Sequence, residues 1–269
     1  MTAIVELKNA TKVVKNGFDE EKIILNDVSL EIFEQDFITI LGGNGAGKST
    51  LFNTIAGTLS LTSGTIRILG EDVTKFSPEK RAKYLSRVFQ DPKMGTASRL
   101  TIEENMAIAY RRGKTRSFFK RSITEEERQI FKGALEHLGL GLENRMKTDA
   151  NFLSGGQRQA LTLSMATLVR PKVLLLDEHT AALDPKTSDM VMNLTKKVVE
   201  EQKLTTLMVT HNMEHAIEYG NRLIMLFHGK IVVDVKGEEK ENLTVAQLMD
   251  LFHKNSGQVP VSYTHLTLP

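Results

Sequence analysis

The sequence predicts an α/β fold: a parallel β-sheet covered by helices, with an N-terminal antiparallel β subdomain and an inserted α-helical subdomain. Three patterns predict it. Residues 37–41 form an apolar run that leads into a Gly-rich turn, residues 153–230 alternate strand-like and helix-like stretches, and residues 91–152 carry helical periodicity. Alternation of strands and helices is typical of parallel sheets, because the crossover helices cover the faces of the sheet.

The first 90 or so residues predict the antiparallel subdomain. Short strand-like runs stand at 23–25, 28–32 and 65–69, and turn residues such as Ser63, Gly64 and Gly70 separate them. We expect these runs to form an edge sheet laid against the core of the fold.

Capping boxes mark two of the expected helix starts. Thr124 stands three residues before Glu127, and Thr244 stands three residues before Gln247. Apolar residues follow the first box at 130, 131, 134, 135 and 138, which is helical spacing. We therefore expect a helical subdomain over about 91–152 and a last helix after residue 244.

The turn after residue 41 spells G-x-x-x-x-G-K-S. Its glycines let successive N–H groups face one anion, and the helix that follows adds the positive end of its dipole. A purely structural turn would explain the glycines but not the Lys-Ser pair. We expect a nucleoside triphosphate with Mg²⁺, with Lys48 on the β- and γ-phosphates and Ser49 in the metal shell. The residues expected to bind it are Gly42, Gly43, Asn44, Gly45, Ala46, Gly47, Lys48, Ser49 and Thr50.

Three further short motifs follow. Ser154 and Gln157 flank two glycines ahead of a helical stretch, an arrangement that is also an ordinary capping box. Asp177 and Glu178 end an apolar strand-like run, and His211 ends another. Carboxylates and an imidazole at strand ends predict metal binding and proton transfer.

Taken in order, these motifs resemble the ATP-binding subunit of an ATP-binding cassette (ABC) transporter, from about residue 4 to about residue 252. The matching segments are 42–49 (Walker A), Gln90 (Q-loop), 153–157 (signature), 173–178 (Walker B), 182–184 (D-loop) and His211 (switch histidine). His179 and Ala181 stand where the commoner family wording has Pro and Ser. The chain is similar to bacterial importer ATPases that work with a separate solute-binding protein.

The resemblance implies ATP hydrolysis. Glu178 is the expected general base, and Asp177, Ser49 and Gln90 are the expected Mg²⁺ ligands. His211 would hold the γ-phosphate and the attacking water, Lys48 would neutralise phosphate charge, and Gln90 would report nucleotide occupancy to the membrane subunit.

The resemblance also implies partners. Ser154, Gly155, Gly156 and Gln157 would close on ATP held by a second cassette, which predicts a homodimer or a heterodimer. Asp184 would share that interface, although a residue before Pro185 also makes a good helix N-cap. We expect membrane permease subunits, an extracytoplasmic solute-binding protein and a place on the cytoplasmic face of the membrane.

Composition bounds the alternatives. The chain has 269 residues, 41% apolar residues, no Cys and a net charge of +2, so nothing favours a nucleic-acid groove or a disulfide framework. We expect no signal sequence, and the apolar runs are much shorter than a membrane-spanning helix requires. The subunit that spans the membrane would therefore be another polypeptide. The rival hypothesis is a soluble ABC-type ATPase that acts on nucleic acid or ribosomes, which would favour a coiled-coil insertion or two cassettes in one chain. A nucleotide switch without turnover is opposed by Glu178 and His211.

The sequence also suggests roles for three further regions. Val14, or Phe18 slightly later, stands where relatives stack adenine, so GTP should compete with ATP. Residues 111–121 hold six basic residues around two Phe and are expected to be a solvated loop rather than a membrane-binding segment. Residues 253–269 are expected to form a tail. Residues 260–269 resemble translated adapter sequence and are left out of the fold, with a native but floppy terminus as the alternative. The transported solute, an amino acid by resemblance, would be set by other subunits.

Overall fold

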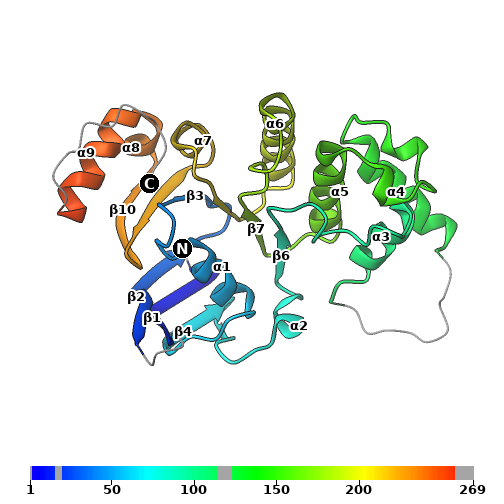
Figure 1. Cartoon of the computed structure of the whole chain (residues 1–269). Helices are drawn as coiled ribbons and strands as arrows, with labels where there is room; N and C mark the ends of the chain where they lie inside the picture. Colours follow the sequence, from blue (N-terminus) through cyan, green and yellow to red (C-terminus); the bar gives the residue numbers. More distant parts are fainter. Residues whose placement is uncertain (1, 16–19, 114–122, 258–269) are drawn as a thin grey trace. The chain divides into compact units, whose positions relative to one another are not determined.

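The computed structural model describes residues 2–15, 20–113 and 123–257. The chain divides into two compact units, which are Met1–Arg81 with Thr205–Pro269, and Ala82–Leu204 (Figure 1). The expected domain bounds, residues 4–252 with a helical subdomain at 91–152, remain a prediction.

The first unit contains an antiparallel sheet in the order β2-β1-β4-β5. Its strands are β1 (Val5–Lys15), β2 (Glu21–Ile32), β4 (Ser63–Ile68) and β5 (Glu71–Asp72). The two runs expected at 23–25 and 28–32 form the single strand β2. The antiparallel subdomain predicted from the sequence is confirmed.

A second sheet of this unit contains β3 at its centre. β3 (Phe37–Leu41) pairs in parallel with β8 (Thr206–Val209) on one side and β9 (Arg222–Phe227) on the other. β10 (Lys230–Lys236) then pairs with β9 in the antiparallel sense. All five residues of β3 are buried, as a parallel strand covered on both faces requires.

Helices complete the first unit. They are α1 (Lys48–Ala56), α2 (Pro78–Arg81), α7 (Met213–Glu218), α8 (Glu238–Glu241) and α9 (Val245–Ser256). A buried cluster joins α7 and α9 to β9 and β10, with Met213, Met225, Leu248 and Phe252 among its members. The expected last helix is confirmed, since Thr244 and Gln247 form a complete capping box at its start.

The second unit combines a short parallel strand pair with helices. β6 (Leu85–Val88) pairs with β7 (Val173–Asp177). The helices are α3 (Ile102–Tyr110), α4 (Glu125–Glu136), α5 (Gly155–Leu168) and α6 (Pro185–Glu201), with 3₁₀ turns η1 (Leu142–Asn144) and η2 (Ala150–Phe152). Thr124 caps α4 through the capping box predicted from the sequence.

Within the described ranges, no helix is both long enough and apolar enough to cross a membrane. The basic segment expected at 111–121 is described only through residue 113. Arg112 there is not solvated: its guanidinium donates to Ser86 Oγ, to the Ala166 carbonyl at 2.9 Å and to the Val169 carbonyl. Arg112 therefore anchors the end of α3 to α5 and β6, which corrects the solvated reading for this residue.

Candidate nucleotide-binding and hydrolysis site

The Gly-rich turn connects β3 to α1 in the first unit. Gly47, the residue before α1, has φ of 107°, a value that an L side chain rarely adopts. A Cβ on Gly42 would lie 2.7 Å from the carbonyl oxygen of Leu226, so the chain passes there too closely for any side chain. The glycines thus form a tight turn that leads directly into a helix N-terminus, which is a favourable anion site.

Lys48 is the first residue of α1 and is 7% exposed. Its Nζ donates to the carbonyl oxygens of Gly42 at 2.6 Å and Gly43 at 3.2 Å, so the ammonium lies against the loop. Ser49 follows as an exposed residue. The loop and the first turn of α1 therefore bring together backbone N–H groups, the ammonium of Lys48 and the hydroxyls of Ser49 and Thr50.

His211 lies at the same edge of this sheet as the loop. β8 and β3 run in parallel, and the Thr210 N–H donates to the Ile40 carbonyl at 3.1 Å, next to the end of β3. His211 is exposed there. Since the carboxyl ends of parallel strands meet at one edge, the structure brings this imidazole and the phosphate loop to the same side.

Asp177 and Glu178 lie in the second unit, where β7 ends. Asp177 forms an ion pair with Arg87 of the neighbouring strand β6. Glu178 has φ of 45°, a left-handed conformation that is uncommon for a residue with a side chain. Such strained positions concentrate at functional sites, because the surrounding structure must hold them.

His179 is one of the residues that holds this turn. It is 2% exposed, and its Nε2 lies 2.9 Å from Thr195 Oγ1 of α6. The Thr195 hydroxyl donates to the Val191 carbonyl at 2.8 Å, so the hydroxyl accepts from His179, whose proton is then on Nε2. The sequence shows His179 only as a departure from the commoner family motif and does not predict this bond, because Thr195 lies 16 residues further along the chain.

Gln90 is exposed and stands two residues beyond β6. The carbonyl of Phe89, just before it, accepts a hydrogen bond from Gln159 Nε2 of α5 at 3.2 Å. The base of the Q-loop is therefore tied to the helix that begins at the signature.

The signature and the D-loop are neighbours in the second unit. Ser154 caps α5 and forms the predicted capping box with Gln157. A Cβ on Gly156 would lie 2.3 Å from Thr187 Cγ2 of α6, so only glycine allows this contact. Asp184 caps α6, as predicted, and hydrogen bonds from Thr187 lower the pKa of its carboxyl.

The predicted Mg²⁺ ligands have suitable chemistry. A hydroxyl, an amide and a carboxylate are hard oxygen donors, and Mg²⁺ is usually bound by one or two carboxylates together with substrate phosphates and waters. Within the part of the chain that the structure describes, no group of three or more His, Cys, Asp or Glu residues forms a protein-only metal site.

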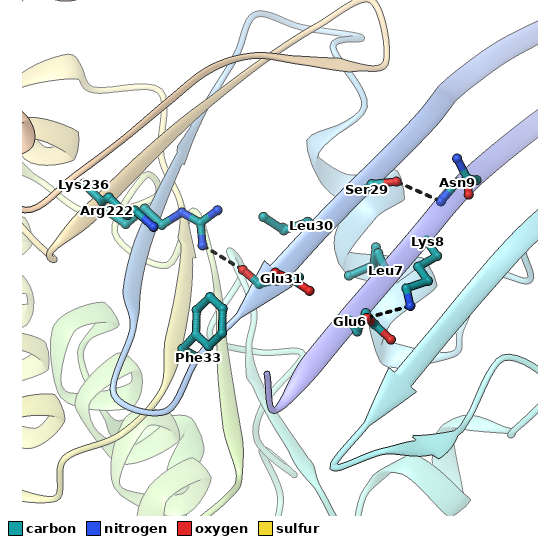
Figure 2. Close-up of a pocket in the computed structure, with 10 residues that line it drawn as sticks. All are labelled: Glu6, Leu7, Lys8, Asn9, Ser29, Leu30, Glu31, Phe33, Arg222 and Lys236. Carbon is teal, nitrogen blue, oxygen red and sulfur yellow. Dashed lines mark hydrogen bonds and ion pairs between the residues drawn. The ribbon is translucent and has the colours of Figure 1, made fainter. Parts of the chain in front are cut away.

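A cavity of about 560 Å³ lies elsewhere, on the antiparallel sheet of the first unit (Figure 2). Within it, Glu6 forms an ion pair with Lys8 at 3.0 Å, and Arg222 donates to the Glu31 carbonyl at 2.7 Å and forms an ion pair with Asp234 at 2.6 Å. None of the predicted site residues lines it. Of the two candidates for adenine contact, Val14 is exposed on β1, whereas Phe18 lies outside the described residues.

Comparison with known proteins gives a consistent result. The ABC transporter family model matches residues 25–181. The chain is 45% identical to a tyrosine transport ATP-binding protein of Clostridioides difficile (strain R20291), over 93% of this chain and 98% of that protein. It is 34% identical to a phosphonates import ATP-binding protein of Lactobacillus delbrueckii subsp. bulgaricus, over 88% of this chain and 91% of that protein. A dimeric ATP-binding cassette solved in a post-hydrolysis state with ADP and Pi shares 33% identity and a TM-score of 0.73, over 86% of this chain and 98% of that chain.

The chain belongs to the ABC transporter family. It is an ATP-binding, ATP-hydrolysing subunit of the importer type, which energises transport through a separate membrane permease. The predicted fold class, a P-loop core with an antiparallel β subdomain and a helical subdomain, is confirmed. The alternative, a soluble ATPase acting on nucleic acid or ribosomes, is not favoured.

Proposed function

We propose that this subunit powers the import of an amino acid, and specifically of tyrosine or a similar aromatic amino acid. One observation carries the proposal: the 45% identity to a tyrosine transport ATP-binding protein runs over 98% of that protein. The solute itself would be recognised by the permease and by an extracytoplasmic solute-binding protein, with this subunit on the cytoplasmic face of the membrane.

Nucleotide binding is assigned to the phosphate loop. Residues 42–50 present N–H groups to the phosphates, and Lys48 exchanges its contacts with the Gly42 and Gly43 carbonyls for contacts with the phosphates. Ser49, Gln90 and Asp177 would hold Mg²⁺. When bound with ATP, the metal supplies positive charge that offsets the charge on the phosphate oxygens.

Hydrolysis is assigned to Glu178 and His211. The Glu178 carboxylate accepts the proton of the attacking water, and its fixed left-handed backbone limits the positions that the carboxylate can reach. The His211 imidazole holds the water and the γ-phosphate in line. Because phosphoryl transfer depends mainly on positioning and charge, these two groups would act together with Lys48, the loop N–H groups and the metal.

Assembly is assigned to the signature and the D-loop. Ser154, Gly155, Gly156 and Gln157 form a helix start that would close on ATP bound to a second copy of this chain, and Asp184 would meet the same interface. The packing of Gly156 on Thr187 supports this, since it holds the signature beside the D-loop helix. In this proposal residues 4–252 form the working cassette, with the helical part at 91–152.

Reconstitution tests the solute assignment. The subunit would be placed in liposomes with its permease and solute-binding protein, with ATP on the subunit's side. We expect ATP-dependent uptake of labelled tyrosine that excess tyrosine or phenylalanine reduces and excess alanine does not. The Glu178→Gln variant should give no uptake. If these vesicles transport another solute but not tyrosine, the solute assignment is wrong while the ATPase assignment stands.

A further inference from the structure

Arg87 and Asp177 are brought together by the register of β6 and β7. Arg87 lies opposite Leu175, and Val88 lies opposite Leu176. Side chains alternate between the faces of a sheet, so Arg87, Leu175 and Asp177 share one face. Asp177 is the diagonal neighbour of Arg87, a spacing that a long side chain can span.

The guanidinium of Arg87 contacts two parts of the proposed site, the Asp177 carboxylate and the Phe89 ring. Its Nη2 donates to Asp177 Oδ2, and both side chains are only 15% exposed. Its Cζ also lies 4.9 Å from the centre of the Phe89 ring, a cation–π contact with the residue next to Gln90. One cation therefore contacts both the Walker B carboxylate and the base of the Q-loop.

We propose that Arg87 is the internal counterion of Asp177 and that it competes with the divalent metal for this carboxylate, so that Arg87 sets the metal dependence of nucleotide binding. The inference rests on the proposed assignment of Asp177 as a metal ligand. A carboxylate this sheltered from water needs a positive partner. Arg87 supplies that partner before the metal arrives, and a metal–nucleotide complex must displace the guanidinium or share the carboxylate with it.

Competition between Arg87 and the metal for Asp177 predicts the direction in which the metal affinity changes when Arg87 is removed. If the ion pair occupies about nine-tenths of the metal-free molecules, the metal meets an accessible carboxylate in about one-tenth of them, and the apparent affinity is lowered about tenfold. Removing Arg87 should therefore let the metal act at a lower concentration. A residue that merely aligned Asp177 for the metal would give the opposite sign.

The test measures nucleotide binding instead of turnover. The dissociation constant of a non-hydrolysable ATP analogue would be measured by calorimetry across a Mg²⁺ titration, for the full chain and for Arg87→Met and Arg87→Lys. We expect the half-saturating Mg²⁺ concentration to fall about tenfold in Arg87→Met. For Arg87→Lys, which keeps the charge but not the planar fork, the half-saturating Mg²⁺ concentration should lie between those of the wild type and Arg87→Met.

Arg170→Met is the matched control. Arg170 is exposed, bonds the Lys203 carbonyl at 3.1 Å and stands ahead of the same strand β7, so its loss also removes one positive charge. Its Mg²⁺ dependence should match the wild type. In an Asp177→Asn background, Arg87→Met should have no further effect on the Mg²⁺ dependence, because the contested carboxylate is gone.

The possible outcomes distinguish a failure of the proposed metal site from a failure of the proposed competition by Arg87. If the wild type binds the analogue without any Mg²⁺ dependence, the proposed metal site is wrong. If the wild type depends on Mg²⁺ but Arg87→Met does not change that dependence, or weakens metal binding, only the competition is overturned. A loss of thermal stability in Arg87→Met with unchanged Mg²⁺ dependence would likewise make Arg87 purely structural.

A second readout follows the displacement itself. The chain has no Trp and four Tyr, so Phe89→Trp introduces a single tryptophan beside the guanidinium, which can be excited apart from tyrosine, while keeping a cation–π partner. Adding Mg²⁺ with the analogue should change its emission more than adding the analogue with EDTA. The difference should vanish when Arg87→Met is combined with Phe89→Trp, and its persistence would contradict the displacement of Arg87.

Discussion

Lys48 illustrates how one residue is prepared for an anion. Its ammonium is nearly buried and is held by two carbonyl oxygens of its own loop, which are neutral acceptors. Because a phosphate oxygen is a charged acceptor, it forms a stronger bond with the same ammonium. The cation is therefore positioned in the loop and can exchange weaker partners for stronger ones.

Lys48→Ala should abolish ATP turnover and weaken ATP binding. The change removes the cation proposed to face the phosphates, and loss of one such group typically reduces turnover by about a hundredfold or more. Steady-state phosphate release and calorimetry with ATP would measure both effects. Lys254→Ala, at an exposed position on α9, should behave as the wild type. Wild-type turnover in Lys48→Ala would refute the assignment of the loop.

At the scale of elements, the turn between β7 and α6 depends on a bond to the interior of the helix. His179 donates to Thr195, three turns into α6, while Asp184 caps the start of the same helix. The left-handed Glu178 is thus fixed from one side by the strand and from the other by α6.

Thr195→Val keeps the shape of the side chain but removes the acceptor for His179. We expect kcat to fall about tenfold with little change in the KM for ATP, because small displacements of a catalytic group have large effects on rate while the phosphate loop is untouched. Thr167→Val is the matched control, since Thr167 also bonds a carbonyl of its own helix at 3.0 Å but belongs to α5. Equal losses of kcat in both variants would show a general packing effect.

At the end of a second element, α7, the backbone carbonyls are bound by a buried lysine of α8, Lys240. Lys240 is 2% exposed and donates to the carbonyls of Ile217, Tyr219 at 2.8 Å and Gly220 at 2.8 Å. Burial lowers the pKa of Lys240 from 10.5 to about 8. Between these values the unfolded chain holds a proton that the folded chain has lost, so the free energy of unfolding contributed by this residue rises with pH.

The comparison of wild type with Lys240→Met measures this contribution. Between pH 7.5 and 9.5 the wild type should gain about 2 kcal/mol relative to the variant, since each pKa unit corresponds to about 1.4 kcal/mol. Urea unfolding at the two pH values gives the difference, and Lys254→Met accounts for the loss of one lysine. A difference between wild type and Lys240→Met that is the same at both pH values would contradict the lowered pKa.

For the whole molecule, hydrolysis and assembly are expected to be linked. Glu178→Gln keeps the size of the side chain but removes the carboxylate proposed to take the proton of water. ATP should still bind, turnover should collapse, and the protein should shift from monomer to dimer with ATP but not with ADP. Light scattering with each nucleotide would measure the shift.

Ser154→Arg, added to Glu178→Gln, should prevent the shift by placing a bulky cation in the signature turn. The variant keeps the phosphate loop, so ATP binding to single chains should persist. A protein that stays monomeric with ATP, both alone and in the presence of its permease, would contradict the two-chain arrangement.

The sequence by itself determined what depends on neighbours within a few residues. The phosphate loop, the capping boxes at Thr124, Ser154 and Thr244, and the Asp184–Pro185 helix start were all predicted and are present in the structure. Their physical basis is short-range, because a cap or a glycine turn is satisfied by backbone groups three or four residues away. The order of the motifs along the chain was enough to predict the family.

Only the tertiary structure decided which distant side chains meet. Arg87 and Asp177 are 90 residues apart and pair because β6 and β7 adopt one register. Arg112 was expected in a solvated loop, but in the structure its guanidinium donates to the carbonyls of Ala166 and Val169. Such contacts depend on how strands align and helices pack, and nothing within a few residues of Arg87 or Arg112 specifies the partner. The sequence of a motif identifies the reactive groups, and the packing around them decides which charges they face.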